Sequence, residues 1–117
     1  MKYAESLKKN YEFRVVYRRG KSFANKYLVV YKLKNNKPGN RLGISVSKKV
    51  GNSVVRSRTT RLIRESYRLN EENIEKQGWD FVIVARSNAN GASYQDISSA
   101  LIHLLKQHRV YGKQEDL

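Results

Sequence analysis

The run W-D-F-V-I-V-A-R at residues 79–86 limits the fold more than any other segment of this chain. Its length and its content of β-branched and aromatic residues are typical of a β-strand. The apolar residues are nearly continuous rather than alternating, which is the pattern of a strand covered on both faces. We therefore expect this strand to lie at the centre of a sheet or to be flanked by helices.

Two further strands are expected before it. Residues 26–34 (K-Y-L-V-V-Y-K-L-K) are rich in β-branched and aromatic side chains, and the turn-forming residues N-N-K-P-G-N follow at 35–40. Residues 41–47 alternate strictly between two faces. The apolar face carries Leu42, Ile44 and Val46, and the other carries Gly43, Ser45 and Ser47. These patterns predict a hairpin of 26–34 with 41–47.

Three segments have helical spacing. The first helix is expected from Leu7 to Arg19 and should end near Gly20. The second should run from Val54 to Leu69, after the capping residues Gly51-Asn52-Ser53. A capping box of Ser93 with Asp96 precedes apolar residues at helical intervals and predicts the third helix.

The expected order of elements is therefore α-β-β-α-β-α. This order indicates an α+β fold, with one small mixed β-sheet packed with helices. A chain of 117 residues is long enough for a single modest core. We expect one domain over residues 1–117, with frayed ends at 1–6 and 112–117.

Positive charge is concentrated in the first part of the chain. Residues 1–68 contain 19 Lys and Arg and 3 acidic residues, whereas residues 69–117 contain 5 and 7. Such a field attracts a polyanion, so we expect nucleic acid as the partner; no basic stretch has the free apolar face that a membrane surface would need. Without cysteine, a signal-like start or a long apolar window, the chain is expected to be soluble and cytoplasmic.

The second helix separates its arginines from its aliphatic residues. At about 100° per residue, five arginines lie on one side of the helix. They are Arg56, Arg58, Arg61, Arg64 and Arg68. The opposite side holds Val55, Leu62, Ile63 and Leu69, with Thr59 and Ser66 between them. Only Glu65 is available to pair with the arginines, so this face is expected to bind an external anion rather than remain a solvated surface.

Two other groups of residues bear on function. Lys48 and Lys49 lie just before the second helix, where backbone amides add to an anion site. The rings of Phe13 and Tyr17 share a helix face, and Tyr27, Val29 and Tyr31 share one face of the strand at 26–34. The small residues of the neighbouring strand leave room above the sheet, so these rings could stack on unpaired bases or simply pack in the core.

No catalytic group is expected on the protein itself. His103 and His108 have no carboxylate at a spacing that makes a dyad or a metal pair, and we expect both at the surface or at its rim. The acidic residues Glu65, Asp80 and Asp96 fall on different elements.

The segment S-V-S-K-K-V-G-N-S-V-V-R-S-R-T-T-R-L-I-R-E closely resembles the protein subunit of bacterial ribonuclease P, which has a Lys-Lys-x-Gly-Asn stretch leading into an Arg-Asn-Arg helix. Residues 7–20, 24–31 and the two later strands are similar to that family as well. The resemblance implies an endoribonuclease in which an RNA subunit carries the chemistry with its own Mg²⁺, none being held by the protein alone. It also implies a left-handed β-α-β crossover at the second helix.

The resemblance further assigns roles to residues. The five arginines of the second helix would bind the catalytic RNA: Arg56, Arg58, Arg61, Arg64 and Arg68. A cleft between the first helix and the sheet would bind the 5′ leader of precursor tRNA through Phe13, Tyr17, Tyr31, Lys48, Lys49 and Asn52. The expected assembly is a protein monomer with one ribonuclease P RNA, acting in tRNA 5′ maturation without DNA or membrane partners. Two positions depart from the family pattern, Ser57 in place of Asn and Thr60 in place of a basic residue.

Two alternatives remain open at this point. A ribosomal or rRNA-maturation protein could have the same basic face and take no part in cleavage. The chain could also be a nuclease in its own right.

Overall fold

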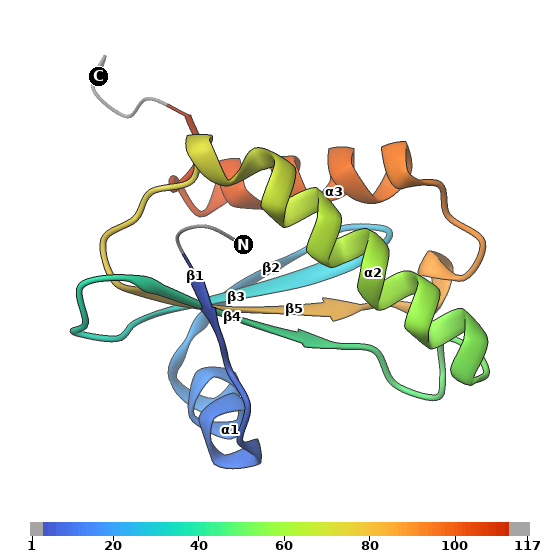
Figure 1. Ribbon diagram of the computed structural model, residues 1–117, viewed down its shortest axis with the longest axis horizontal. Coiled ribbons are helices and arrows are strands. Elements are labelled where there is room, and N and C mark those ends of the chain that lie inside the picture. Colours follow the sequence, from blue (N-terminus) through green and yellow to red (C-terminus); the bar gives the residue numbers. More distant parts are fainter. Residues whose placement is uncertain (1–3, 113–117) are drawn as a thin grey trace.

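The computed structural model describes residues 4–112 and contains one five-stranded sheet, three α-helices and two short 3₁₀ helices. The strands are β1 (Ala4–Ser6), β2 (Lys21–Ala24), β3 (Leu28–Lys34), β4 (Asn40–Ser45) and β5 (Trp79–Ala85). The helices are α1 (Asn10–Arg19), α2 (Ser53–Asn70) and α3 (Tyr94–Gln107), with η1 (Glu71–Asn73) and η2 (Ser87–Ala89). Figure 1 shows α2 and α3 on one face of the sheet and α1 on the other.

The strand order is β1-β4-β5-β3-β2, so β5 is central as its apolar run predicts. It pairs parallel with β4 and antiparallel with β3. Phe81 and Ile83 are buried in the main core with α2 and α3. Val82, on the opposite face, is buried with Val16 of α1 in a second, smaller core. Because helices cover both faces of the sheet at β5, its apolar residues are nearly continuous instead of alternating with polar ones.

The expected hairpin of 26–34 with 41–47 is wrong. The central strand β5 lies between β3 and β4, and the strands that form an antiparallel hairpin are β2 and β3. Alternation along a strand shows which faces are buried, but it does not show which strand lies next to it, so the pairing could not be read from the local pattern.

The expected fraying of residues 1–6 is also wrong for residues 4–6. Ala4–Ser6 form β1, which pairs parallel with Asn40–Leu42 of β4. At the other end, the Gly112 N–H donates to the Asn73 carbonyl at 2.7 Å. The rest of both expected frayed ends, 1–3 and 113–117, lies outside the described residues.

The helix ends follow the expected capping with one exception. Ser93 and Asp96 form the predicted capping box of α3, and Asn52 caps α2 by accepting from the Val55 N–H at 3.0 Å. Helix α1 begins at Asn10 rather than Leu7, because the Glu12 carboxylate accepts from the N–H groups of both Lys8 and Lys9. Gly20 ends α1 with an ordinary φ of −81°, and a Cβ there would approach the Val16 carbonyl to 2.6 Å.

Helix α2 connects the parallel neighbours β4 and β5. This is the β-α-β unit to which the resemblance assigns a left-handed crossover. No helix within residues 4–112 is long and apolar enough to cross a membrane.

Candidate nucleic-acid interface

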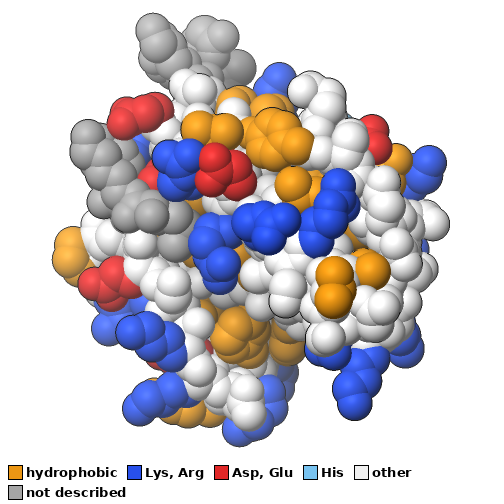
Figure 2. Space-filling model, turned by 45° about the vertical axis from the view of Figure 1, so that its right-hand side comes forward, with side chains coloured by type: hydrophobic (Ala, Val, Ile, Leu, Met, Phe, Trp, Pro, Cys, Tyr) orange, Lys and Arg blue, Asp and Glu red, His pale blue; other side chains and the backbone are white. Residues whose placement is uncertain are grey.

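The outer face of α2 is a line of exposed arginines. Thr59, Ile63, Ser66 and Tyr67 form the buried side of the helix. Arg58, Arg61, Arg64 and Arg68 are exposed on the other side, as their spacing predicts. We call these four residues the arginine face, and Figure 2 shows Lys and Arg side chains gathered across this side of the molecule.

Arg56 does not belong to this face. It is half-buried, and its Nε is buried without a hydrogen-bond partner among the described residues. The buried side of α2 is rotated relative to the prediction: Tyr67 is fully buried, whereas Leu69 is 56% exposed. Tyr67 lies about 20° from Arg56 on the helical wheel, so the helix docks through the side that Arg56 borders.

The four arginines differ in what they already bind. Arg68 pairs with Glu65 through two hydrogen bonds of 3.0 and 2.6 Å, and these bonds hold the pKa of Glu65 below its ordinary value. Arg58 donates to the Ala92 carbonyl at 3.2 Å. Within residues 4–112, Arg61 and Arg64 make no ion pair or side-chain hydrogen bond, so their guanidinium groups are the most available to an external anion.

A second candidate surface lies between α1 and the sheet. The rings of Phe13 and Tyr17 are 6.4 Å apart, and those of Tyr17 and Tyr31 are 5.1 Å apart and edge-to-face. Beside them is a hollow of about 450 Å³, which we call the aromatic hollow. It is lined by Asn10, Phe13, Arg14, Tyr17, Ile44, Ser45 and Val46. The structure thus brings the three predicted rings together, and two of them, Phe13 and Tyr17, line the hollow.

The hollow is smaller than the pattern of small residues suggests. A Cβ on Gly43 would lie 2.7 Å from ring carbons of Phe13, so this ring fills the space above Gly43. The open space begins at Ser45. Tyr27, expected on the same strand face as Tyr31, instead precedes β3 and packs against the main core.

Sequence reasoning missed two residues of the hollow, Asn10 and Arg14. They lie three residues before Phe13 and three before Tyr17, on the helix face that these rings share. This i, i+3 spacing could have identified both residues from the sequence. Arg14 is exposed and places a cation beside the rings.

The loop after β4 joins the two surfaces. Val46 lines the aromatic hollow, and the exposed side chains of Lys48 and Lys49 follow in a turn anchored by buried Val50. Asn52 then caps α2 with its side-chain oxygen. The basic loop therefore starts at the hollow and ends at the first turn of the helix that carries the arginine face.

A partly buried ion network fixes α1 against the sheet. The Arg41 guanidinium binds Glu12 of α1 at 2.8 Å and Asp80 of β5 at 2.6 Å. The backbone N–H groups of Lys9 and Lys8, followed by Arg41, lower the pKa of Glu12. Asn35 also donates to Asp80, at 2.8 Å.

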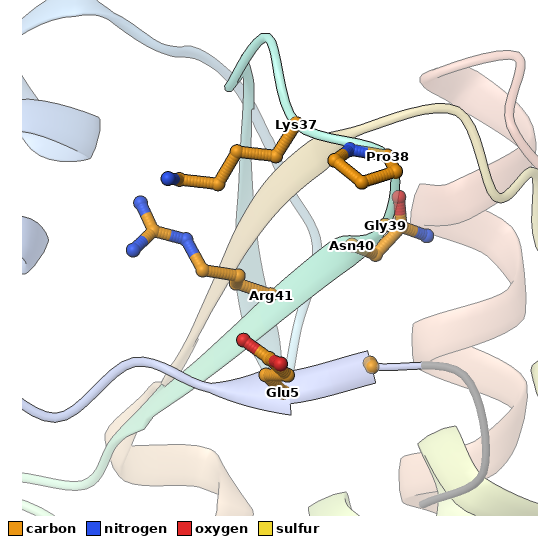
Figure 3. Close-up of a pocket in the computed structure, with 7 residues that line it drawn as sticks. Glu5, Lys37, Pro38, Gly39, Asn40 and Arg41 are labelled. Atoms are coloured by element: carbon orange, nitrogen blue, oxygen red, sulfur yellow. The ribbon is translucent and has the colours of Figure 1, made fainter.

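Another hollow, of about 400 Å³, lies beside this network at the β1–β4 edge. Figure 3 shows the side chains of Lys37 and Arg41 extending to the same side of it. The Arg41 guanidinium is already bound by two carboxylates, so this hollow offers only the Lys37 ammonium as a free cation among the residues that line it.

The prediction that both histidines lie at the surface or its rim is wrong for His108. This residue is 2% exposed, its Nε2 is 2.7 Å from the Val30 carbonyl, and its ring packs edge-to-face on Phe23. His103 is exposed. The described residues contain no group of three or more His, Cys, Asp and Glu residues that could hold a metal ion.

Residues 1–109 match the model of the Ribonuclease P family. The chain belongs to this family. The ribonuclease P protein component of Lachnoclostridium phytofermentans is 61% identical over 112 residues, covering 96% of each chain. That of Clostridium botulinum is 58% identical over 106 residues, covering 91% of this chain and 96% of the relative.

Solved structures of ribonuclease P proteins share the fold. The Staphylococcus aureus protein has a TM-score of 0.83 and 38% identity, covering 92% of this chain and 97% of that one. The Thermotoga maritima protein has a TM-score of 0.79 and 32% identity, covering 88% and 96%. The mixed five-stranded sheet with three helices is therefore the fold of ribonuclease P proteins.

The two departures from the ribonuclease P pattern lie at different depths. Ser57 is exposed on α2, and Thr60 is half-buried. A shallow hollow of about 380 Å³ lies on the arginine face and is lined by Ser53, Val54, Ser57, Arg58 and Arg61. The short Ser57 side chain thus leaves space between arginines at the first departure.

Proposed function

We propose that this chain is the protein subunit of ribonuclease P and promotes removal of the 5′ leader from precursor tRNA. Its family membership and its relatives, which are ribonuclease P protein components, support this role and do not favour a ribosomal protein. The observation that carries the proposal is the presence of two different surfaces on one small domain, one cationic and one aromatic, each with the chemistry that binds RNA.

The arginine face binds the catalytic RNA. Guanidinium groups bridge phosphate oxygens through paired hydrogen bonds and remain charged at every physiological pH. Arg61 and Arg64, which have no partner among the described residues, contribute most to this binding. Arg58 and Arg68 first exchange an internal contact for a phosphate, so each contributes less. Half-buried Arg56 contacts RNA only at the border of the face.

The aromatic hollow binds the unpaired leader. Unpaired bases stack on flat side chains, and each such stack contributes about 1–3 kcal/mol in other single-strand binding proteins. Tyr17 neighbours both Phe13 and Tyr31 and is 38% exposed, so part of its ring is accessible to an entering base. Arg14 and the loop cations Lys48 and Lys49 neutralise the phosphates along this path.

The hydrolytic chemistry belongs to the RNA subunit, which holds the Mg²⁺ ions. The chain's own contribution is to hold leader and catalytic RNA together, so that precursor tRNA binds more tightly than mature tRNA. We propose that one protein monomer serves one RNA subunit in the cytoplasm.

Reconstitution with ribonuclease P RNA tests the function. Adding the purified protein at low magnesium is expected to increase the rate of leader removal. The absence of any gain would contradict the proposal and favour a ribosomal or rRNA-maturation role. Precursor tRNA incubated with the protein alone should remain intact, and cleavage by a clean preparation would instead indicate an intrinsic nuclease.

A further inference from the structure

Strand β1 covers only half of the outer edge of β4. The pairing of β1 with β4 runs from Asn40 to Leu42 and ends when the Leu7 N–H donates to the Leu42 carbonyl at 2.9 Å. The chain then turns away into α1, which begins at Asn10. Beyond Leu42, the outer edge of β4 has no neighbouring strand within the described residues.

Main-chain groups of β4 point to this open edge. Main-chain direction alternates along a strand, so Ile44 faces the same side as Leu42, while Gly43 and Ser45 face β5. Ile44 therefore presents both its N–H and its carbonyl away from the sheet. Val46, two residues later, makes no main-chain hydrogen bond within residues 4–112. Both residues line the aromatic hollow.

The surroundings indicate what such an edge would bind. The N–H donor and the carbonyl acceptor of Ile44 are matched by a ligand group that can both accept and donate a hydrogen bond. The cation of Arg14 and the rings of Phe13 and Tyr17 line the same hollow and favour a single-stranded nucleic acid. The ribose 2′-hydroxyl of RNA is both donor and acceptor, and DNA lacks it. A main-chain edge carries no base-reading side chain, which suits leaders of differing sequence.

We propose that the open edge of β4, at Ile44 and Val46, binds ribose 2′-hydroxyl groups of the leader and so selects an RNA leader over a DNA leader. This inference rests on the proposed binding of the leader in the aromatic hollow. It adds a contact made by main chain, which no substitution that keeps the backbone N–H would remove.

Chimeric substrates test the sugar preference directly. One precursor tRNA carries an all-ribose leader, and its match carries 2′-deoxyribose in the leader except at the nucleotides flanking the scissile bond, so that the chemical step is unchanged. With the reconstituted holoenzyme, we expect the deoxyribose leader to bind about threefold to tenfold more weakly, the loss of one or two net hydrogen bonds.

A proline variant tests the role of the edge itself. Ile44→Pro removes the outward N–H and leaves the ladder to β5 intact, because proline is tolerated on an edge strand when its nitrogen faces outward. Ile44→Ala is the matched control, since it removes the side chain and keeps the N–H. Thermal unfolding and binding of ribonuclease P RNA alone report whether each variant is folded.

The comparison of both variants on both substrates decides the proposal. We expect Ile44→Pro to bind ribose and deoxyribose leaders alike, whereas Ile44→Ala keeps the discrimination. Equal weakening on both substrates would show a steric effect and overturn the proposal, as would wild-type protein that binds both leaders equally. If Ile44→Pro altered only self-association in sedimentation, the edge would belong to a second copy of the chain. A wild-type holoenzyme with no preference for precursor over mature tRNA would refute the proposed function instead.

Discussion

The four residues of the arginine face are all exposed on one side of α2, but they have different local partners. Arg68 is held by Glu65 through two hydrogen bonds, whereas Arg61 is unpaired within the described residues. Exposed ion pairs contribute little to stability, but a guanidinium that must leave a carboxylate gains less from a phosphate. The availability of each arginine therefore depends on its neighbours, which a helical wheel does not show.

Substitution of single arginines should reveal this difference. Arg61→Ala is expected to weaken binding of ribonuclease P RNA and to reduce the slope of log K against log salt by about 0.7–0.9, the value for one lost phosphate contact. Arg68→Ala, which removes the same charge from the same face, should reduce the slope less. Binding titrations over a range of salt concentrations measure both, and a larger effect of Arg68→Ala would contradict this ranking.

Buried His108 should make stability depend on pH. Burial lowers its pKa below the ordinary value of 6.5, and the nearby cations Lys32 and Lys21 act in the same direction. The unfolded chain then binds the proton at a higher pH than the folded chain, so stability decreases as pH falls below 6.5. Denaturant unfolding at several pH values should show this slope in wild type and in His103→Gln. A slope between pH 6.5 and about 5, above the range in which carboxylates titrate, that persists unchanged in His108→Gln would rule out this histidine as its source.

At the scale of elements, the contact of α1 with the sheet sets the width of the aromatic hollow. Phe13 lies directly over Gly43, and the Glu12–Arg41–Asp80 network holds the start of the same helix. A side chain at residue 43 would therefore move the helix or the ring rather than fill empty space.

Gly43→Ala should change both stability and leader binding. The added Cβ meets the Phe13 ring at 2.7 Å, and overpacking of this kind costs about 1–3 kcal/mol of unfolding free energy. We expect lower stability and a weaker preference for leader-bearing tRNA. Combining it with Phe13→Leu should recover stability, because the smaller side chain makes room, without recovering the preference. Unchanged stability in Gly43→Ala would show that the ring moves at no cost.

At the scale of the whole molecule, α2, which carries the arginine face, and α1, which lines the aromatic hollow, lie on opposite faces of the sheet (Figure 1). No arginine of the arginine face lines the aromatic hollow. Changes at separate sites usually add within a few tenths of a kcal/mol. We therefore expect the free-energy losses of Arg61→Ala and Phe13→Ala to sum in the double variant. Two affinities are measured for both single variants and for the double variant: that of the holoenzyme for precursor tRNA and that of the protein for ribonuclease P RNA. Additivity is tested within each affinity. A marked departure from additivity would mean that the basic loop at Lys48 and Lys49 couples the two surfaces.

Local pattern predicted the elements better than their arrangement. The continuous apolar run of β5, the caps Asn52 and Ser93 and the outward arginines of α2 all follow from short-range physics. The short strands β1 and β2 were missed because A-E-S and K-S-F-A contain too few apolar residues to show a period. The insertion of β5 between β3 and β4 depends on contacts between distant parts of the chain.

Burial of polar residues was equally hard to predict. His108 is buried because the end of α3 meets the Val30 carbonyl and the Phe23 ring, both far away in sequence. In the candidate site, Phe13 and Tyr17 were predicted on one helix and Tyr31 on a strand, and the resemblance placed the three rings in one cleft. The open edge of β4 could not be predicted at all, since it follows from where β1 stops.

The central position of β5 also has a consequence for synthesis on the ribosome. Strand β5, which pairs with both β3 and β4, begins at residue 79. About two-thirds of the polypeptide therefore emerges before the sheet can form. The two-stranded pairs that can form earlier, β2 with β3 and β1 with β4, are at best marginally stable alone. Yet residues 1–68 already carry 19 basic and 3 acidic side chains. The nascent chain is therefore strongly cationic while still unfolded, and it meets the surrounding ribosomal RNA in that state.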